Sequence, residues 1–448
     1  MINRKVYNYL DNYYKTNGKA LLVTGARQTG KSYAIRHFGK THFKSLIEVN
    51  FVEMPEAISV VAEAKNRKDM LLRLSLLTNK PLIEGKTLVF FDEVQECPEI
   101  VTAIKFLVEE GSYRYIMSGS LLGVELKDLR SEPVGYMDIK EMYPLDIEEF
   151  FAALGVSDKV LAEVREAWEQ KRPIDAFVHT KLMELFRLYL IVGGMPAVVQ
   201  KYIDTNNLQQ VMAEQQAIIR LYKRDIAKYD RNHKLYIEEI FDLIPSELNA
   251  KNKRFILKNL NENLKFARYE NSFIWLKEAG VAIPVYNAEE PVMPLKLSRS
   301  RNLFKLFQND IGLLACQYAD GIQLRLLTKA QSINFGSIYE NVVAQELHAH
   351  GFDLYYFNSK KQGELDFVIE KGGQAIPIEV KSGKDYQRHN ALSNVMANED
   401  YAMRQAYVFS NENLNQEGKV LYVPIYMVAF MEKEVSVDIT YRVDLSGL

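Results

Sequence analysis

A glycine-containing loop between an apolar strand pattern and a helical pattern constrains the fold of this chain more than any other feature. The strand pattern covers Ala20–Thr24, and the helical pattern covers Tyr33–Phe38. Between them lies the spacing G-x-x-x-x-G-K-[ST], formed by Gly25, Ala26, Arg27, Gln28, Thr29, Gly30, Lys31 and Ser32. Glycines at these positions let backbone N–H groups turn inward around a phosphate, at the positive end of the following helix. The pattern therefore predicts a phosphate-binding loop at the end of a parallel strand.

The side chains of this loop predict what it holds. The Lys31 ammonium can reach the β- and γ-phosphates of a nucleoside triphosphate, and the Ser32 hydroxyl can bind Mg²⁺. We expect all eight loop residues and the adjacent Tyr33 to contact the nucleotide. Lys31 is assigned to catalysis as well, because its charge faces the phosphate that is transferred.

Polar residues end the next two apolar strand patterns. Asp92 and Glu93 follow Thr87–Phe91, and Ser118 follows Tyr115–Met117. A carboxylate at a strand end can hold the magnesium shell, and its neighbour can position the attacking water. We assign Asp92 to Mg²⁺ and Glu93 to catalysis. Ser118 is expected to contact the γ-phosphate, with a plain turn serine as the alternative.

Changes of pattern along the 448 residues predict four domains. Alternating apolar strands and helices in residues 1–150 predict a doubly wound α/β core of the P-loop type. Helical periodicity dominates residues 151–242, which we interpret as a lid. Residues 243–335 predict a winged-helix-like module, and residues 336–448 predict a second α/β domain. The expected strands of the winged-helix hairpin are Phe273–Leu276, Val281–Tyr286 and Pro291–Leu297.

Charged residues alternate with apolar ones in a hairpin expected over residues 365–380. Asp366 lies in its first strand, and Glu379 and Lys381 share one face at the end of the second. These two carboxylates, with Glu340 from the preceding helix, can bind one or two Mg²⁺ ions. Lys381 can orient or deprotonate a water. Asp366, Glu379 and Lys381 are therefore candidate catalytic residues, and Glu340, Asp366 and Glu379 are candidate metal ligands.

Nine segments spread over most of the chain resemble a single family. They are GARQTGKS, FFDEVQECPE, MSGSLLG, YPLDIEEF, YLIVGGMPAVV, FKLFQNDIGLL, NFGSIYENVVAQEL, YYFNSKKQGELDFVI and IPIEVKSG. Together they resemble the prokaryotic AAA-type ATPases that carry a C-terminal domain of unknown function. The resemblance implies ATP as the nucleotide, bound at Gly25, Gly30, Lys31 and Ser32, with Asp92 and Glu93 as the second acidic motif.

The C-terminal set is similar to restriction-endonuclease-like nucleases of the D…E-x-K type. Carried over residue by residue, this resemblance implies a nuclease site at Asp366, Glu379 and Lys381, with Glu340 from the helix. The expected fold is thus an AAA-type P-loop core with a helical lid, a winged-helix-like module and a restriction-endonuclease-like α/β domain.

The sequence departs from the AAA-type family at one position. Many relatives place Gly-Arg shortly before the YPL segment, whereas Gly135 is followed here by Tyr136. If that arginine completes a neighbour's site in a homo-oligomer, this chain either lacks such an arginine or takes it from elsewhere. Arg130 and Arg224 are candidates on position alone, and a solvated or salt-bridged arginine is the ordinary alternative.

The distribution of charge leaves the target of the C-terminal domain open. The chain holds 56 Lys and Arg against 58 Asp and Glu, a net charge of −2, which excludes a generally basic nucleic-acid coat protein. Residues 336–448 hold 16 acids and 10 basic residues, a balance of −6, although duplex-binding domains usually present positive charge. Basic residues gather instead in 251–268 and 296–305, where a winged helix could contact DNA or a solvated surface could carry them.

Three functions follow as alternatives from these patterns. The first is an ATPase coupled to a domain that binds or cleaves nucleic acid. The second is a nucleotide-controlled switch that binds a protein partner through a catalytically silent nuclease-like domain. The third is an ATP-binding scaffold without turnover.

Cysteine content and hydropathy give expectations about the compartment. The two cysteines, Cys97 and Cys316, fit a reducing cytoplasm. The longest apolar run, Leu188–Val199, contains two glycines and a proline and is too short to span a bilayer. We expect a cytoplasmic protein that does not enter a membrane.

Overall fold

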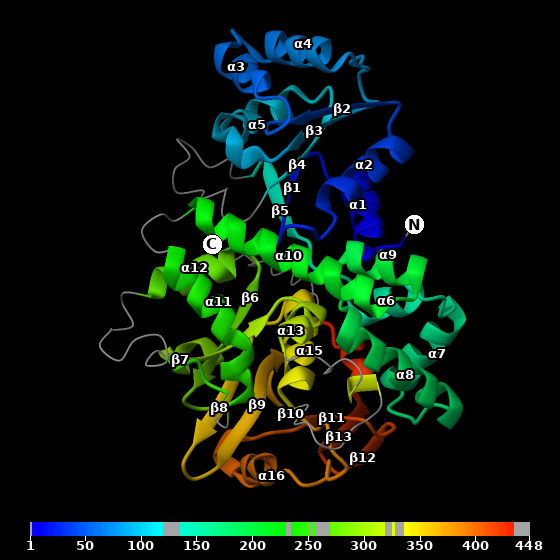
Figure 1. The fold of residues 1–448 in the computed structure, drawn as a ribbon, viewed down its shortest axis with the longest axis vertical. Coiled ribbons are helices and arrows are strands. Elements are labelled where there is room, and N and C mark those ends of the chain that lie inside the picture. The colour runs from blue at the N-terminus through cyan, green and yellow to red at the C-terminus, as the bar shows by residue number, and fades with distance from the viewer. Residues whose placement is uncertain are drawn as a thin grey trace, which may run out of the picture.

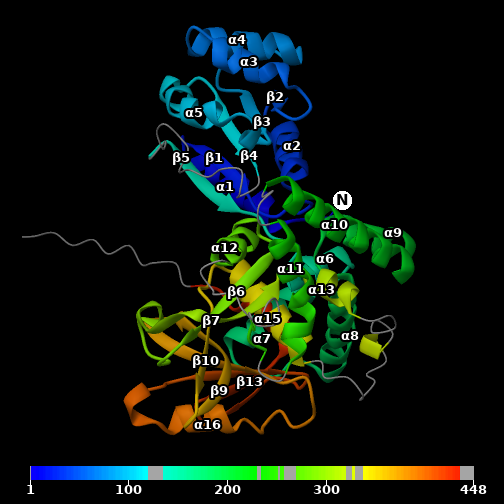
Figure 2. The ribbon, with the colours of Figure 1, turned by 60° about the vertical axis from the view of Figure 1, so that its left-hand side comes forward.

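A computed structural model gives the fold (Figure 1). It describes residues 2–119, 135–229, 234–250, 253–256, 269–318, 325–327 and 336–433. Two sheets lie at opposite ends of the molecule, and helices fill the space between them (Figures 1 and 2).

The N-terminal sheet has five parallel strands in the order β2-β3-β4-β1-β5. The strands are β1 (Ala20–Thr24), β2 (Ser45–Asn50), β3 (Thr87–Asp92), β4 (Arg114–Ser118) and β5 (Met137–Glu141). Every residue of β1 and β3 is buried, as expected for strands covered on both faces. The apolar runs in the sequence predict β1, β3 and β4 but not β2 or β5.

Helices cover both faces of this sheet, which explains the continuous apolar runs. Leu21 and Phe90 pack under α1 (Lys5–Thr16) and α2 (Lys31–His42). Leu22 and Phe91, one residue further along each strand, face the opposite layer. That layer comprises α3 (Glu56–Glu63), α4 (Arg67–Thr78) and α5 (Pro98–Glu110).

Helices follow β5 up to residue 249, whereas the periodicity predicts them up to residue 242. They are α6 (Ile147–Ala153), α7 (Asp158–Glu169), α8 (Ala176–Val192), α9 (Pro196–Thr205), α10 (Leu208–Tyr229) and α11 (Lys234–Asn249). The long helix α10 crosses the molecule between the two sheets (Figure 1). Among the described helices none is by itself long and apolar enough to cross a bilayer, and α8 with α9 reaches that length only as a pair bent by 118°.

The second sheet has eight strands in the order β12-β13-β11-β10-β9-β8-β6-β7. The strands are β6 (Ala282–Ala288), β7 (Arg299–Gln308), β8 (Tyr355–Ser359), β9 (Gly363–Lys371), β10 (Gln374–Val380), β11 (Ala406–Ser410), β12 (Asn415–Glu417) and β13 (Val420–Pro424). The helices in this region are α12 (Glu270–Glu278), α13 (Ile311–Gln317), α15 (Gly336–Ala349) and α16 (Asn390–Ala397). The predicted hairpin of β9 and β10 is present, and its two strands pair antiparallel.

The region predicted as a winged helix differs from that expectation in three ways. The run Phe273–Leu276 is part of α12 and not a strand, because Ser272, Phe273 and Leu276 bury one helical face. The strand that pairs with β6 is β7, which begins after the predicted Pro291–Leu297. The hairpin of β6 and β7 also joins the C-terminal sheet through β8 and does not form a separate wing.

The basic segment 251–268 lies mostly outside the described residues, which include only 253–256 of it. The domain boundaries at residues 150, 242 and 335 stay predictions.

Candidate functional site

The predicted phosphate loop connects β1 to α2, so that its backbone lies at the N-terminal end of a helix. Gly30, the residue before α2, has a φ of 91°. Gly25 has a φ of 127°, and a Cβ there would lie 2.2 Å from the carbonyl oxygen of Met142. Gly30 is therefore required for its backbone conformation. Gly25 is required both for its conformation and because the Met142 carbonyl leaves no room for a side chain.

Lys31 points into this loop. Its ammonium donates to the carbonyl oxygens of Gly25 and Ala26, at 2.9 and 2.8 Å. Burial lowers the pKa of Lys31 to about 8, while the nearby carboxylates of Glu93 and Asp92 oppose that shift. The positive charge is thus held inside the loop, where a phosphate would pair with it.

Asp92 collects hydroxyl and amide donors at the carboxyl ends of three strands. Ser32 Oγ donates to Asp92 Oδ1 at 3.0 Å, and Ser118 Oγ donates to the same oxygen. Asn50 Nδ2 donates to Oδ2 at 3.1 Å, and an Arg36 guanidinium nitrogen lies 3.9 Å from that oxygen. The carboxylate is buried, so its orientation is fixed by these contacts.

Glu93 follows directly in a left-handed conformation with a φ of 57°. Few glutamates adopt this conformation, since it costs on the order of 1 kcal/mol relative to a helical or extended residue. Its carboxylate accepts a hydrogen bond from Gln95 Nε2. The backbone thus turns sharply after Asp92 and gives the two adjacent carboxylates different surroundings.

Helix α10 contacts the outside of the loop. Arg27 forms an ion pair with Asp225 at 3.0 Å, and the Tyr222 hydroxyl donates to the Arg27 carbonyl oxygen at 3.2 Å. Tyr33, which was expected to contact nucleotide, is 57% exposed at the start of α2. The phosphate loop is therefore tied to the helix that crosses between the sheets.

Two residues of this region were not found by sequence reasoning. Asn50 ends β2, a strand that was not predicted, and it orients Asp92. Arg4 is buried near the N-terminus and donates to the carbonyl oxygens of Thr29 and Tyr143, at 3.2 and 2.8 Å. An isolated arginine before a helix carries no motif, so nothing in the sequence singles it out.

Arg130 and Arg224 are the two candidates for the arginine that completes a neighbour's site, and that role stays a prediction. Arg224 is exposed on α10, and Arg130 lies outside the described residues.

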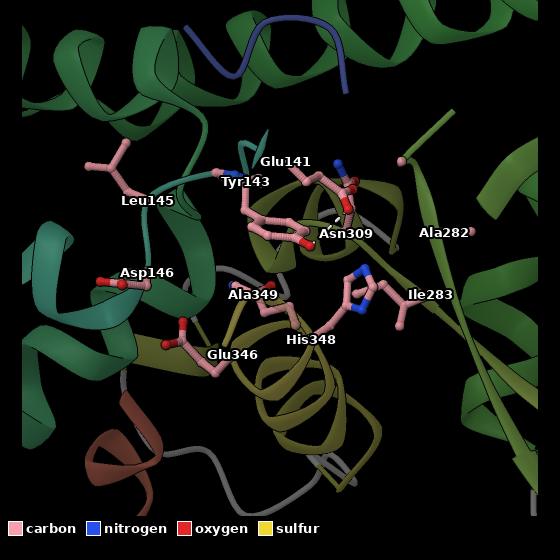
Figure 3. A pocket seen from close by; sticks show the side chains of 13 residues that line it. Glu141, Tyr143, Leu145, Asp146, Ala282, Ile283, Asn309, Glu346, His348 and Ala349 are labelled. Carbon is pink, nitrogen blue, oxygen red and sulfur yellow. Dashed lines mark hydrogen bonds between the residues drawn. The ribbon is translucent and has the colours of Figure 1, made fainter. Parts of the chain in front are cut away.

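The segment after β5 packs against the C-terminal helix α15 (Figure 3). The Ile147 N–H and the Tyr189 hydroxyl both donate to Glu346 Oε1 of α15, at 3.1 and 3.2 Å. The Tyr143 hydroxyl donates to Glu141 at 2.8 Å, in the same seam. The cavity lined by Glu141, Tyr143 and Glu346 measures about 20 Å³, room for about one water. At this cavity the segment after β5 and α15 are thus closely packed.

A second cluster of charged side chains lies on the C-terminal sheet. The register places Ile378 of β10 opposite Phe367 of β9, which brings Glu379 beside Asp366. Asp366 Oδ2 accepts the Val380 N–H at 2.9 Å, and the Lys381 ammonium lies 3.3 Å from Glu379 Oε2.

Glu340, on α15, faces the same group. Burial and the neighbouring Asp366 raise the pKa of Glu340 to about 7. The same two causes raise the pKa of Glu379, because burial disfavours its charge and Asp366 lies beside it. The structure thus places Glu340 near Asp366, with Glu379 and Lys381 beside it, and the role of these four residues as a catalytic or metal site stays a prediction.

Two further lysines enter this cluster. The Lys253 ammonium contacts Glu340 Oε1, and the fully buried Lys305 ammonium lies 2.8 Å from Glu364 and 3.7 Å from Glu340 Oε2. Although burial opposes the charge of Asp366, these two lysines lower the pKa of its carboxyl. Nothing in the spacing of Lys253 and Lys305 predicts that they reach the cluster.

The donor atoms at the two sites fit Mg²⁺ to different degrees. The hydroxyls of Ser32 and Ser118 and the carboxylate of Asp92 are the oxygen ligands that Mg²⁺ prefers. The carboxylates of the C-terminal cluster have the right chemistry, but lysine ammonium groups contact them. Over the described ranges, no three His, Cys, Asp or Glu side chains are placed to hold a metal ion together.

Three families match successive parts of the sequence. Residues 17–151 match a family described as an AAA domain. Residues 183–324 match a domain of unknown function, DUF8612, and residues 335–428 match another, DUF4143. Among proteins with curated descriptions, none matches this chain.

Solved structures give distant likenesses. A Walker-type ATPase of Pyrococcus abyssi is 13% identical with a TM-score of 0.42, over 71% of this chain and 96% of its own. The ORC1 protein of Aeropyrum pernix in complex with DNA is 12% identical with a TM-score of 0.28, over 74% and 93%. A structure concerning katanin self-assembly is 14% identical with a TM-score of 0.23, over 35% and 59%.

The likeness of the N-terminal region to known proteins is therefore given by the family match and by the order of strands in its sheet. The match over residues 17–151 covers all five strands of the parallel sheet, together with the glycine loop and Asp92. Residues 17–151 thus match an AAA domain, and the two matched regions that follow match families without a described function.

Proposed function

We propose that the protein binds ATP with Mg²⁺ in the loop Gly25–Ser32 and hydrolyses it. The observation that carries this proposal is the convergence of Ser32 and Ser118 on the buried Asp92, beside the ammonium of Lys31. The triphosphate tail would lie along the loop N–H groups, and Lys31 would exchange its two carbonyl contacts for phosphate oxygens. Ser32 and Asp92 would hold the Mg²⁺, which when bound would neutralise part of the phosphate charge.

Glu93 is the proposed general base that orients the attacking water. We expect Glu93→Gln to lower the ATP turnover number by about 100-fold with little change in ATP affinity, because the amide cannot accept the water's proton. Phosphate release and calorimetric ATP binding measure the two quantities. The matched control is Glu96→Gln, an exposed glutamate three positions further on, which should leave both unchanged. Wild-type protein that binds ATP but releases no phosphate would instead support the scaffold alternative.

Hydrolysis is proposed to move α10 relative to the parallel sheet. Arg27 of the loop is held by Asp225 and Tyr222 of that helix, so a change of loop conformation would pull on α10 directly. Helix α10 lies between the two sheets and packs against α11 and α13, which makes it one connection between the two ends of the molecule (Figure 2).

The second proposed function is magnesium-dependent cleavage of nucleic acid at the C-terminal cluster. The observation that favours it is the approach of Glu340 and Lys381 to the adjacent Asp366 and Glu379. The alternative, a nucleotide-controlled switch that binds a protein partner without cutting, is favoured by the contacts of Lys253 and Lys305 with the same carboxylates.

A supercoiled plasmid incubated with Mg²⁺ and ATP separates these two functions. Cleavage at the cluster predicts that nicking by the wild type falls at least about 100-fold in Asp366→Ala, because that carboxylate is central to the site. Asp385→Ala, an exposed aspartate of the same region, is the matched control and should nick as the wild type does. Nicking that persists in Asp366→Ala would place the activity elsewhere. Absence of nicking by the wild type, with ATP-dependent retention of a protein, would support the switch.

A further inference from the structure

Two carbonyl oxygens of the phosphate loop accept hydrogen bonds from side chains that belong to other parts of the chain. The Arg27 carbonyl accepts from the Tyr222 hydroxyl, on α10, at 3.2 Å. The Thr29 carbonyl accepts from a guanidinium nitrogen of Arg4, the residue before α1, also at 3.2 Å. Both donor side chains are buried. The loop backbone is therefore held by two elements that are distant from it in sequence.

The direction of these carbonyls sets the direction of the N–H groups that follow them. In a planar trans peptide the C=O and the N–H point in opposite directions. With the Thr29 carbonyl turned toward Arg4, the Gly30 N–H is directed to the opposite side of the loop, and the Arg27 carbonyl sets the next N–H in the same way. Gly30 directly precedes α2, whose first N–H groups have no acceptor within the helix. The two contacts thus favour the orientation in which loop N–H groups can receive a phosphate.

Arg4 is itself held in one position. Its Nε donates to Glu149 of α6 at 3.0 Å, and its second terminal nitrogen donates to the Tyr143 carbonyl at 2.8 Å. Glu149 also accepts the Lys5 N–H at 2.6 Å, so the carboxylate is fixed on the other side as well. A guanidinium presents its donors in a rigid fork, which a lysine cannot reproduce. The contact with the loop therefore depends on arginine and not only on positive charge.

Neither donor lies within the matched AAA region. Arg4 precedes residues 17–151, and Tyr222 lies in the second match, over residues 183–324. Ala26 of the loop packs in the same apolar cluster as Tyr222 and Ala279, and a Cβ on Gly280 would lie 3.1 Å from the Ala26 nitrogen. Segments from outside the AAA match thus complete the surroundings of the loop.

We propose that Arg4 and Tyr222 are positioning residues of the nucleotide site. They hold the two carbonyls away from the phosphates and thereby keep the adjacent N–H groups turned toward them. This assignment rests on the proposed ATP site in the loop Gly25–Ser32 and adds two residues from outside the AAA match to it. Because Tyr222 lies on α10, the affinity for ATP and the position of α10 depend on each other.

Calorimetric binding of a non-hydrolysable ATP analogue with Mg²⁺ to the full-length protein tests the assignment. Tyr222→Phe, which removes only the hydroxyl, should raise the Kd about fivefold, the effect of one hydrogen bond. Arg4→Lys, which keeps the charge but loses the fork, should raise the Kd about tenfold. The matched controls are Tyr202→Phe, at a half-buried tyrosine of α9, and Arg404→Lys, at an exposed arginine, and both should bind as the wild type does.

Stoichiometry and turnover separate positioning from a general loss of structure. A displaced loop binds more weakly but still at one site per chain, whereas a partly unfolded sample binds with the wild-type Kd at fewer sites per chain. The turnover number of Tyr222→Phe at saturating ATP should stay within about twofold of the wild type, because loop N–H groups bind the phosphates in the ground state and in the transition state alike.

The possible results distinguish this assignment from the ATP site itself. A wild-type Kd in either variant, with full or with reduced stoichiometry, would overturn the positioning role of that residue and leave the ATP site standing. Absence of binding by the wild type would overturn the ATP site and the assignment together.

Discussion

Replacement of Lys31 by alanine is expected to lower ATP turnover by about 100-fold or more. The buried Lys31 ammonium is held in the loop by the carbonyl oxygens of Gly25 and Ala26. Its loss leaves the negative charge that develops on the phosphate in the transition state without a positive partner. Phosphate release under saturating and limiting ATP gives the effect on kcat and on kcat/KM separately. Lys40→Ala, an exposed lysine near the end of the same helix, is the matched control and should retain wild-type rates.

The outcome also separates roles within the site. A loss confined to kcat/KM would assign Lys31 to ground-state binding alone, whereas a loss of both constants assigns it to the transition state. Wild-type turnover in Lys31→Ala would contradict the proposed orientation of the triphosphate.

The second large effect is expected from Asp310→Ala, which should lower the free energy of unfolding by about 3 kcal/mol. Asp310 is fully buried before α13, where its two oxygens accept from the N–H groups of Leu313 and Gly194 at 2.9 and 2.6 Å. Gly194 in turn accepts from the Leu145 N–H at 2.7 Å, so one carboxylate joins α13, the α8–α9 turn and the segment after β5.

Chemical denaturation measures this loss, and Asp175→Ala supplies the control. Asp175 begins α8 with the same kind of contact, to the N–H groups of Phe177 and Val178, but at the surface. Its removal should cost only about 1 kcal/mol, because water replaces the lost acceptor. Equal losses in the two variants would show that the buried junction adds nothing beyond helix capping.

The pH dependence of stability provides a second readout of Asp310. Burial raises the pKa of this carboxyl from 3.8 to about 6, although three backbone N–H groups oppose the shift. The folded state therefore holds a proton there that the unfolded state has released, so stability falls as the pH rises from about 4 to about 6 and is level above that range. The difference between wild type and Asp310→Ala should shrink across this window.

The phosphate loop and its acidic partner could be predicted because each is encoded locally. The apolar runs before Gly25 and Asp92 are buried on both faces in the sheet, and parallel strands bring their carboxyl ends together. Asn50 could not be predicted, since β2 alternates buried and half-buried residues and carries a glutamate within it. Its role depends on β2 lying beside β3, which is a matter of strand order.

The C-terminal region combines a hairpin that is encoded locally with contacts that short stretches of sequence do not encode. The β9–β10 hairpin follows from its Lys-Gly-Gly turn and alternating residues, and its register brings Asp366 to Glu379. The short apolar run Phe273–Leu276 looks like a strand, but helical burial decides its structure. Lys305 and Lys253 reach Glu340 only because β7 joins the far edge of the same sheet and holds residue 255. Such contacts depend on tertiary arrangement and have no signature in spacing.

Calorimetric titration of a non-hydrolysable ATP analogue with Mg²⁺ into the full-length protein tests the central claim most directly. The account predicts saturable binding of one nucleotide per chain, which is weakened in Lys31→Ala and unchanged in Lys40→Ala. Absence of binding by the wild type, or equal binding by Lys31→Ala, would contradict a nucleotide site between the Gly25–Ser32 loop and Asp92.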